Sequence, residues 1–151
     1  MAGLARKVEV EPITAGAVAG GASRMLLAEG LSPIGEFTLP NGRRLDLAAL
    51  AGDGSIIGVE IKVSLADLRS DGKWPDYLDY CDRFFFAVPP EFPQAVLPPT
   101  TGLIVADRFG GAIVRQSPCR KVAPARRRAL TLRFALIAAE RLTRSLDPNC
   151  V

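Results

Sequence analysis

Residues 55–63 constrain the fold most, because apolar and other side chains alternate along them as in a half-buried strand. One face of this strand is apolar and carries Ile57, Val59, Ile61 and Val63. Glu60 and Lys62 fall together on the other face. The apolar face must pack against another layer, so the segment predicts a sheet strand that presents an acid and a lysine on its second face.

Turn residues divide the rest of the chain into further elements. Strands are predicted over residues 34–39, 43–50, 55–63, 83–88, 102–107 and 112–115. Helices are predicted over residues 14–29, about 65–81 with an interruption near Gly72, and 124 to about 146. The order predicts an α/β fold with an antiparallel three-strand meander, a parallel crossover to the fourth strand and flanking helices. No repeat or linker divides the chain, so a single domain over residues 1–151 is expected, with a core of about 14–146.

Two glycine-closed turns set the register of the first three strands. We expect three-residue loops in which Gly42 and Gly54 adopt the left-handed conformation. Asp46 then falls opposite Glu60, and Glu36 falls opposite Asp46. This register keeps intact an apolar face made of Phe37, Leu39, Leu45, Leu47 and Val59. A two-residue first loop would break that face, so the three-residue loop is favoured.

The register places Glu36, Asp46 and Glu60 in a row across three neighbouring strands. Composition narrows the chemistry that this acid row could perform. The chain contains no histidine, which excludes histidine-dependent catalysis and histidine zinc sites. Its three cysteines are scattered, which is poor material for a disulfide framework or a four-ligand zinc site. Carboxylates about 5 Å apart on neighbouring strands suit a hard divalent cation with oxygen ligands, such as Mg²⁺ or Mn²⁺. Lys62 adds a charge-stabilising or proton-transfer group to the same face.

The spacing of these residues resembles a known nuclease superfamily. Asp46, a hairpin and then Glu60-Ile61-Lys62 are similar to the PD-(D/E)XK motif. A longer set of matches resembles the MmcB-like bacterial DNA repair family: GRRLD (42–46), VEIK (59–62), DGKWPDY (71–77), YCD (80–82) and FAV (86–88). Leu45 stands where the superfamily motif has proline. The resemblance covers about residues 36–107 and implies a restriction-endonuclease-like mixed sheet.

The resemblance also implies roles for individual residues. Asp46 and Glu60 would hold the metal ion, helped by the Ile61 carbonyl, and Lys62 would orient or deprotonate the attacking water. Asp46, Glu60 and Lys62 are therefore the expected catalytic residues. Glu36 joins the expected metal ligands through the register argument alone.

Several further residues are candidates for contact with DNA. Lys73 and Tyr77 are spaced to share a helix face, and Trp74 could stack on a base or belong to the core. Arg44 neighbours the acid row. Arg126, Arg127 and Arg128 open the last helix, where cations oppose the helix dipole, so we expect a phosphate-facing surface or, alternatively, a solvated basic face.

Together these patterns predict a metal-dependent DNA nuclease that acts in DNA repair. The alternative is a non-catalytic protein of the same fold that binds DNA or a repair partner, and a more distant one is an unrelated small α/β binding protein. DNA is the expected partner, and a homodimer or a repair-protein complex is left open. Residues 1–10 lack an apolar signal-peptide core, and no apolar run approaches the roughly 18 residues of a membrane span, so a cytoplasmic protein is expected.

Overall fold

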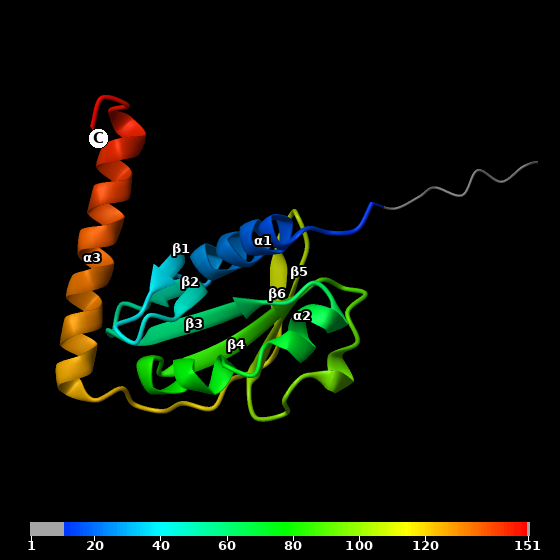
Figure 1. The fold of residues 1–151 in the computed structure, drawn as a ribbon. Helices are drawn as coiled ribbons and strands as arrows, with labels where there is room; N and C mark the ends of the chain where they lie inside the picture. The colour runs from blue at the N-terminus through cyan, green and yellow to red at the C-terminus, as the bar shows by residue number, and fades with distance from the viewer. Residues whose placement is uncertain (1–10, 151) are drawn as a thin grey trace, which may run out of the picture.

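A six-stranded mixed sheet forms the centre of the computed structural model, which describes residues 11–150 (Figure 1). The expectation about a signal peptide therefore lies outside the described residues. The strands are β1 (Ser32–Thr38), β2 (Arg44–Leu50), β3 (Ile56–Ile61), β4 (Arg83–Val88), β5 (Gly102–Ala106) and β6 (Gly111–Arg115). They lie side by side in sequence order, with β3, β4 and β5 parallel and the other pairs antiparallel. The predicted α/β sheet, its antiparallel meander and its parallel crossover are confirmed.

Helices cover both faces of this sheet. The helix α1 (Ala15–Ala28) lies across one face, and α2 (Leu65–Ser70) and the 3₁₀ helix η1 (Trp74–Tyr80) lie on the other side (Figure 1). A short η2 (Gln94–Val96) precedes β5, and the long α3 (Pro124–Leu146) ends the fold. The predicted helix over residues 65–81 is thus two short helices, because Gly72 favours a break and Pro75 starts a new turn. No helix within residues 11–150 combines the length and apolar character needed to cross a membrane.

The layer under α1 depends on a close approach that only glycine permits. A Cβ atom on Gly21 would lie 1.8 Å from the Asp107 carbonyl oxygen and 2.6 Å from that of Gly110. Small residues therefore let α1 sit directly on the turn between β5 and β6. Below α1, the first core contains Leu47, Ala49, Ile57, Val59, Phe85 and Ala87 together with the inner face of the helix.

The predicted register of the first three strands is confirmed. The Leu39 N–H donates to the Arg43 carbonyl at 2.7 Å, and the Ala51 N–H donates to the Ser55 carbonyl at 2.9 Å. Both loops are closed by a glycine in the left-handed region, Gly42 at φ 83° and Gly54 at φ 87°.

The predicted apolar face of this meander is wrong, because β1 and β2 change face together. Phe37, Leu39 and Leu45 pack into the second core with Leu130 and Phe134 of α3, whereas Leu47 and Val59 pack under α1. The switch occurs where the pairing of β1 with β2 is interrupted, between Gly35–Leu47 and Phe37–Leu45.

Glu36 lies at this interruption with φ 51°, a left-handed conformation that is unusual for a residue with a side chain. A strictly alternating strand would keep positions two apart on one face. The rotation at Glu36 and its partner Asp46 breaks that rule while the register stays the same.

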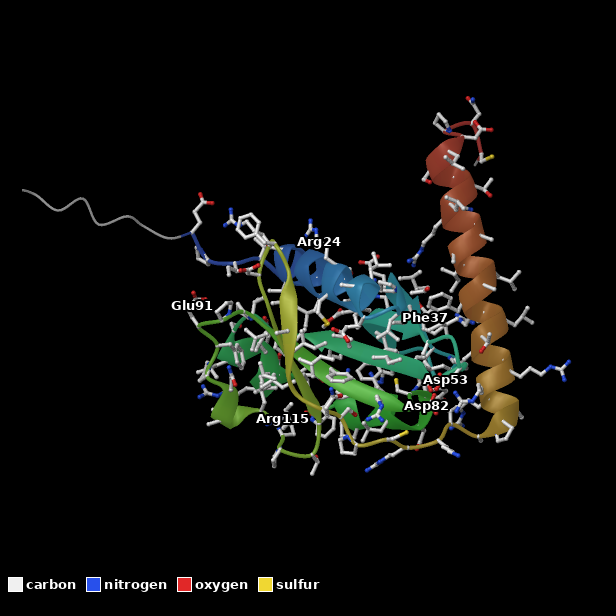
Figure 2. All side chains as sticks on the ribbon, turned by 180° about the vertical axis from the view of Figure 1, so that it is seen from behind. Arg24, Phe37, Asp53, Asp82, Glu91 and Arg115 are labelled. Carbon is white, nitrogen blue, oxygen red and sulfur yellow. The ribbon has the colours of Figure 1, made fainter. Side chains whose placement is uncertain are left out.

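Asp82 anchors the end of the crossover to the start of β3 and to α3. Its buried carboxylate accepts hydrogen bonds from the N–H groups of Ile56 at 2.7 Å and Val122 at 3.0 Å. Arg127 donates to both of its oxygens, at 2.6 Å and 2.5 Å, and Figure 2 shows Asp82 beside the first turn of α3. Burial raises the pKa of Asp82, but these hydrogen bonds outweigh it and lower the pKa to about 2. Asp82 ends the YCD string of the family resemblance, but no sequence pattern predicted that it is buried while Asp79, three residues earlier, is exposed.

We expect Asp82→Asn to lower the free energy of unfolding by about 3 kcal/mol at neutral pH, because it leaves the Arg127 guanidinium without its counter-charge. Thermal melts should show a loss of roughly 10 °C. Folding lowers the pKa of the Asp82 carboxyl, so its contribution to the free energy of unfolding is fully present above its unfolded pKa near 4. That contribution is lost as the pH falls through about 2. The exposed neighbour provides the control: Asp79→Asn should leave the melting temperature within about 1 °C, and equal losses in both variants would contradict the anchoring role.

Candidate active site

An open cleft of about 540 Å³ lies at the C-terminal end of β3 and the N-terminal end of β2. The polar side chains that line it include Asp46, Glu60, Lys62, Asp71, Lys73 and Tyr77, with Arg43 and Arg44 also on the cleft wall. The crossover segment that follows β3 supplies Asp71, Lys73 and Tyr77. The three predicted catalytic residues, Asp46, Glu60 and Lys62, are therefore brought together.

Asp46 and Glu60 bind each other's strand through their carboxylates. The Asp46 N–H donates to Glu60 Oε1 at 3.0 Å, and the Ile61 N–H donates to Asp46 Oδ2 at 2.8 Å. These bonds lie one residue beyond Leu47–Val59, the last regular pair of the two strands. Each carboxylate keeps its second oxygen free of hydrogen bonds to the described residues, so a ligand in the cleft can use both.

Burial and mutual repulsion keep this carboxylate pair from carrying its full charge. Burial, reinforced by the Asp46 carboxylate, raises the pKa of Glu60 to about 8. Burial also raises the pKa of Asp46, although the Ile61 N–H and the Lys62 charge oppose that effect. Near neutral pH the pair therefore holds a proton, which a divalent cation would displace.

Lys62 is held by a carboxylate that sequence reasoning missed. Its Nζ lies 2.7 Å from Asp71 Oδ2, and both side chains are nearly buried. Asp71 also accepts a hydrogen bond from the Lys73 N–H at 3.0 Å, so one residue fixes the lysine and the approach to η1. The one available signal was the position of Asp71 at the start of the DGKWPDY string that carries the family resemblance.

Tyr77 supports the wall of the cleft from η1. Its hydroxyl donates to the Arg44 carbonyl at 3.1 Å, which ties η1 to the start of β2. Burial raises the pKa of Tyr77 to about 12, so the phenol stays protonated and keeps donating. Lys73 is the N-cap of η1 and not part of the helix, so it and Tyr77 share the cleft but not the helix face that was predicted.

Two of the predicted site residues lie elsewhere. Glu36 does not join the acid row: its side chain is 71% exposed, lies 3.9 Å from Arg44 and does not line the cleft. The left-handed backbone at Glu36 is the physical reason. Trp74 belongs to the second core and not to the cleft. The centre of its ring lies 6.1 Å from that of Phe84 and 5.8 Å from that of Phe86.

The arginines that open α3 lie near the opposite end of β3. Arg127 donates to the Gly54 carbonyl, six residues and about 20 Å along the strand direction from Glu60. Its guanidinium is committed to Asp82, which corrects its predicted role as a DNA contact. Arg126 lies over the Tyr80 ring at 4.5 Å, and Arg128 is exposed.

The donor set fits Mg²⁺ or Mn²⁺ better than a metal that needs a complete protein cage. Within residues 11–150 no three histidine, cysteine, aspartate or glutamate side chains gather around one point. Mg²⁺ commonly binds through one or two carboxylates and keeps several waters. The free oxygens of Asp46 and Glu60 in an open, water-accessible cleft match that requirement.

Fold and cleft together define an α/β protein with a paired-carboxylate and lysine site at the edge of a mixed sheet. The family model described as "DNA repair protein MmcB-like" matches residues 7–149, and the chain belongs to this family. A solved structure, the SPO1766 protein of unknown function from Silicibacter pomeroyi, is similar at 41% identity and a TM-score of 0.89. The match covers 95% of this chain and 97% of that one. No curated protein matches the chain.

We expect Glu60→Gln to stabilise the metal-free protein at pH 8. Folding raises the pKa of the Glu60 carboxyl, so its contribution to the free energy of unfolding is largest below its unfolded pKa. That contribution is lost as the pH rises toward about 8. Glutamine keeps an oxygen for the Asp46 N–H and removes that loss, a gain on the order of 2 kcal/mol or about 5 °C. Thermal melts from pH 5 to pH 9 with a chelator measure it. Curves for wild type and variant that stay parallel over this range would contradict a buried, proton-binding Glu60.

Proposed function

We propose that the protein hydrolyses DNA phosphodiester bonds with Mg²⁺ or Mn²⁺ as cofactor, as a nuclease of the PD-(D/E)XK type acting in DNA repair. The observation that carries this proposal is the pairing of the half-buried Asp46 with the buried Glu60 beside Lys62, with a free oxygen on each carboxylate. Membership in an MmcB-like DNA repair family supports DNA as the substrate.

The roles of the residues follow from their positions in the cleft. Asp46 Oδ1 and Glu60 Oε2 would hold the cation, with the Ile61 carbonyl as a further ligand implied by the motif. When bound, such a cation supplies charge neutralisation at the scissile phosphate and a more acidic water. Lys62 Nζ, fixed by Asp71, would orient that water or donate to a phosphate oxygen.

The cations on the cleft wall supply the DNA contacts in this proposal. Arg43, Arg44 and Lys73 line the same cleft as the carboxylates, and in the proposed enzyme they would bind phosphates that flank the cleaved bond. Tyr77 positions Arg44 through its backbone and so acts on DNA binding indirectly.

A non-catalytic DNA-binding protein is the second candidate, and one observation favours it. Lys62 Nζ already pairs with Asp71 at 2.7 Å, so in this arrangement its charge is offset before substrate arrives. In a purely binding protein the same pair would serve only to hold the crossover segment against the end of β3.

A cleavage panel separates the two candidates. We expect wild type with Mg²⁺ or Mn²⁺ to cut at least one of linear, nicked, branched and single-stranded DNA. Asp46→Asn and Glu60→Gln should abolish cutting, and Lys62→Met should lower the rate by about 10²- to 10⁴-fold while metal binding survives. Glu91→Gln, an exposed acid outside the cleft that Figure 2 labels, is the matched control and should retain full activity. If wild type is inert on all four substrates with either metal, the proposed nuclease is contradicted and the non-catalytic DNA-binding protein remains.

Salt dependence of DNA binding tests which cations touch phosphate. Each lost phosphate contact reduces the slope of log K against log salt by about one unit. We expect that reduction for Lys73→Gln and for Arg44→Gln. Arg120→Gln, an exposed arginine whose backbone is bonded to Asp82, should leave the slope unchanged. Fluorescence anisotropy with catalytically inactive protein measures these slopes. A reduced slope for Arg120→Gln together with unchanged slopes for Lys73→Gln and Arg44→Gln would show that DNA binds outside the cleft.

A further inference from the structure

The turn between β5 and β6 carries an exposed aromatic side chain that the proposed function does not use. Phe109 is 78% exposed, the largest value among the bulky apolar residues within residues 11–150. A ring of roughly 150–250 Å² left in water forgoes the free energy that its burial would contribute. Single apolar side chains are common on protein surfaces, so exposure alone assigns no role. What distinguishes Phe109 is a rigid turn, two basic neighbours and a position beside the cleft.

The turn that presents Phe109 is held from both sides. The Asp107 carboxylate accepts hydrogen bonds from the N–H groups of Phe109 at 2.8 Å and Gly110 at 3.1 Å. The Asp107 N–H donates to the Gly110 carbonyl at 2.9 Å. On the other side, Gly21 of α1 packs directly against the carbonyls of Asp107 and Gly110. A turn that is already fixed presents its side chain to a ligand without the entropic cost of ordering a mobile loop.

Two arginines flank the Phe109 ring. Arg24 of α1 donates to the Arg108 carbonyl at 2.6 Å, and Figure 2 shows Arg24 on α1 beside this turn. The Arg108 guanidinium lies over the ring, 5.9 Å from its centre. Both arginines are exposed, and neither forms a salt bridge with an acid within the described residues. The Asp107 carboxylate is occupied by the backbone of the turn, so the two guanidinium charges remain available to a ligand.

The turn also lies next to the candidate active site. Ala15, the first residue of α1, lines the cleft, and Gly21 packs against the turn six residues later. At 1.5 Å per residue these two positions are about 9 Å apart along the helix. Phosphates of one DNA strand follow each other at about 3.4 Å along the axis of B-form DNA. A strand that leaves the cleft over the first turns of α1 therefore reaches Phe109 within about three nucleotides.

We propose that Phe109 stacks on an unpaired base of the DNA substrate while Arg24 and Arg108 bind the adjacent phosphates, an inference that rests on the proposed nuclease function. Stacking on an aromatic side chain needs an accessible base face but no particular sequence. Bases inside a duplex already stack on their neighbours, so the substrate is DNA with a single-stranded stretch beside the bond in the cleft. The two free positive charges and the adjoining cleft favour nucleic acid over an apolar protein or lipid surface as the occupant.

Removal of the ring is the first test. In fluorescence anisotropy with a chelator present, Phe109→Ala should weaken binding of single-stranded oligothymidylate about tenfold and leave binding of a blunt duplex within about twofold. Phe109→Tyr keeps the ring and should bind as wild type does. The matched control is Val114→Ala, which shortens an exposed apolar residue of β6 in the same hairpin and should leave both affinities unchanged. Thermal melts of the same proteins establish that each variant is folded.

Fluorescence tests the stacking itself. Phe109→Trp places an indole at the tip of the turn, and a base that stacks on it should quench its emission when oligothymidylate is added. Wild type contains one tryptophan, Trp74, which packs against the second core, so it should show little change and provides the background. Unchanged emission from a Phe109→Trp protein that binds the oligonucleotide would overturn the stacking.

Salt dependence tests the phosphate contacts. For single strands, each lost phosphate contact reduces the slope of log K against log salt by about 0.7 unit. We expect that reduction for Arg108→Gln on oligothymidylate and no change for Arg120→Gln. Equal slopes for wild type and both variants would overturn the phosphate contact at the turn.

The outcomes separate this inference from the proposed nuclease. Unchanged binding of single-stranded DNA by Phe109→Ala overturns the inference, whereas metal-dependent cutting by wild type would still support the nuclease. A selective loss of single-stranded binding supports the stacking role even if wild type cuts none of the substrates. A loss confined to the duplex would show that Phe109 inserts between paired bases, and it would overturn the inference. Wild type that binds no single-stranded DNA overturns it as well.

Discussion

The face switch at Glu36 and Asp46 is the feature on which the cleft depends. A regular ladder would continue to the ends of β2 and β3 and leave their side chains to alternate into solvent. Instead the pairing of β1 with β2 is interrupted, and the Asp46 N–H and carboxylate both bond to β3. The same rotation sends Leu45 into the second core. Site and core are thus built by one local change in two paired strands.

Two ion pairs hold the crossover between β3 and β4 at its ends. Lys62–Asp71 fixes the beginning, just beyond β3, and Asp82–Arg127 fixes the end, just before β4. Both acids accept backbone N–H groups as well, so each pair also satisfies donors that would otherwise be unpaired. The segment between them contains only six residues of α-helix and one 3₁₀ helix, which have little intrinsic stability. Its tethered ends therefore fix where Lys73 and Tyr77 stand in the cleft.

Sequence patterns predicted the sheet, its register and the meeting of Asp46, Glu60 and Lys62, because these follow from local turn chemistry and a period of two. They failed at Glu36, because a left-handed glutamate has no signature comparable to that of Gly42 or Gly54. Asp71 and Asp82 were missed for a different reason. Their partners lie 9 and 45 residues away in the chain, and only the folded structure brings them together.

The charges in the cleft explain how the two carboxylates can lie together without a cation between them. The buried Glu60 carboxylate and the half-buried Asp46 carboxylate would repel each other if both were ionised, and the raised pKa of Glu60 shows how the fold avoids this. The Lys62 charge lowers the pKa of both carboxyls but does not outweigh burial, and Asp71, which holds its ammonium at 2.7 Å, acts in the opposite direction. A proton therefore takes the place that a divalent cation would occupy in the proposed enzyme. In the proposed enzyme, proton and cation would compete for the same oxygens, so cation affinity should rise with pH until Glu60 is fully ionised.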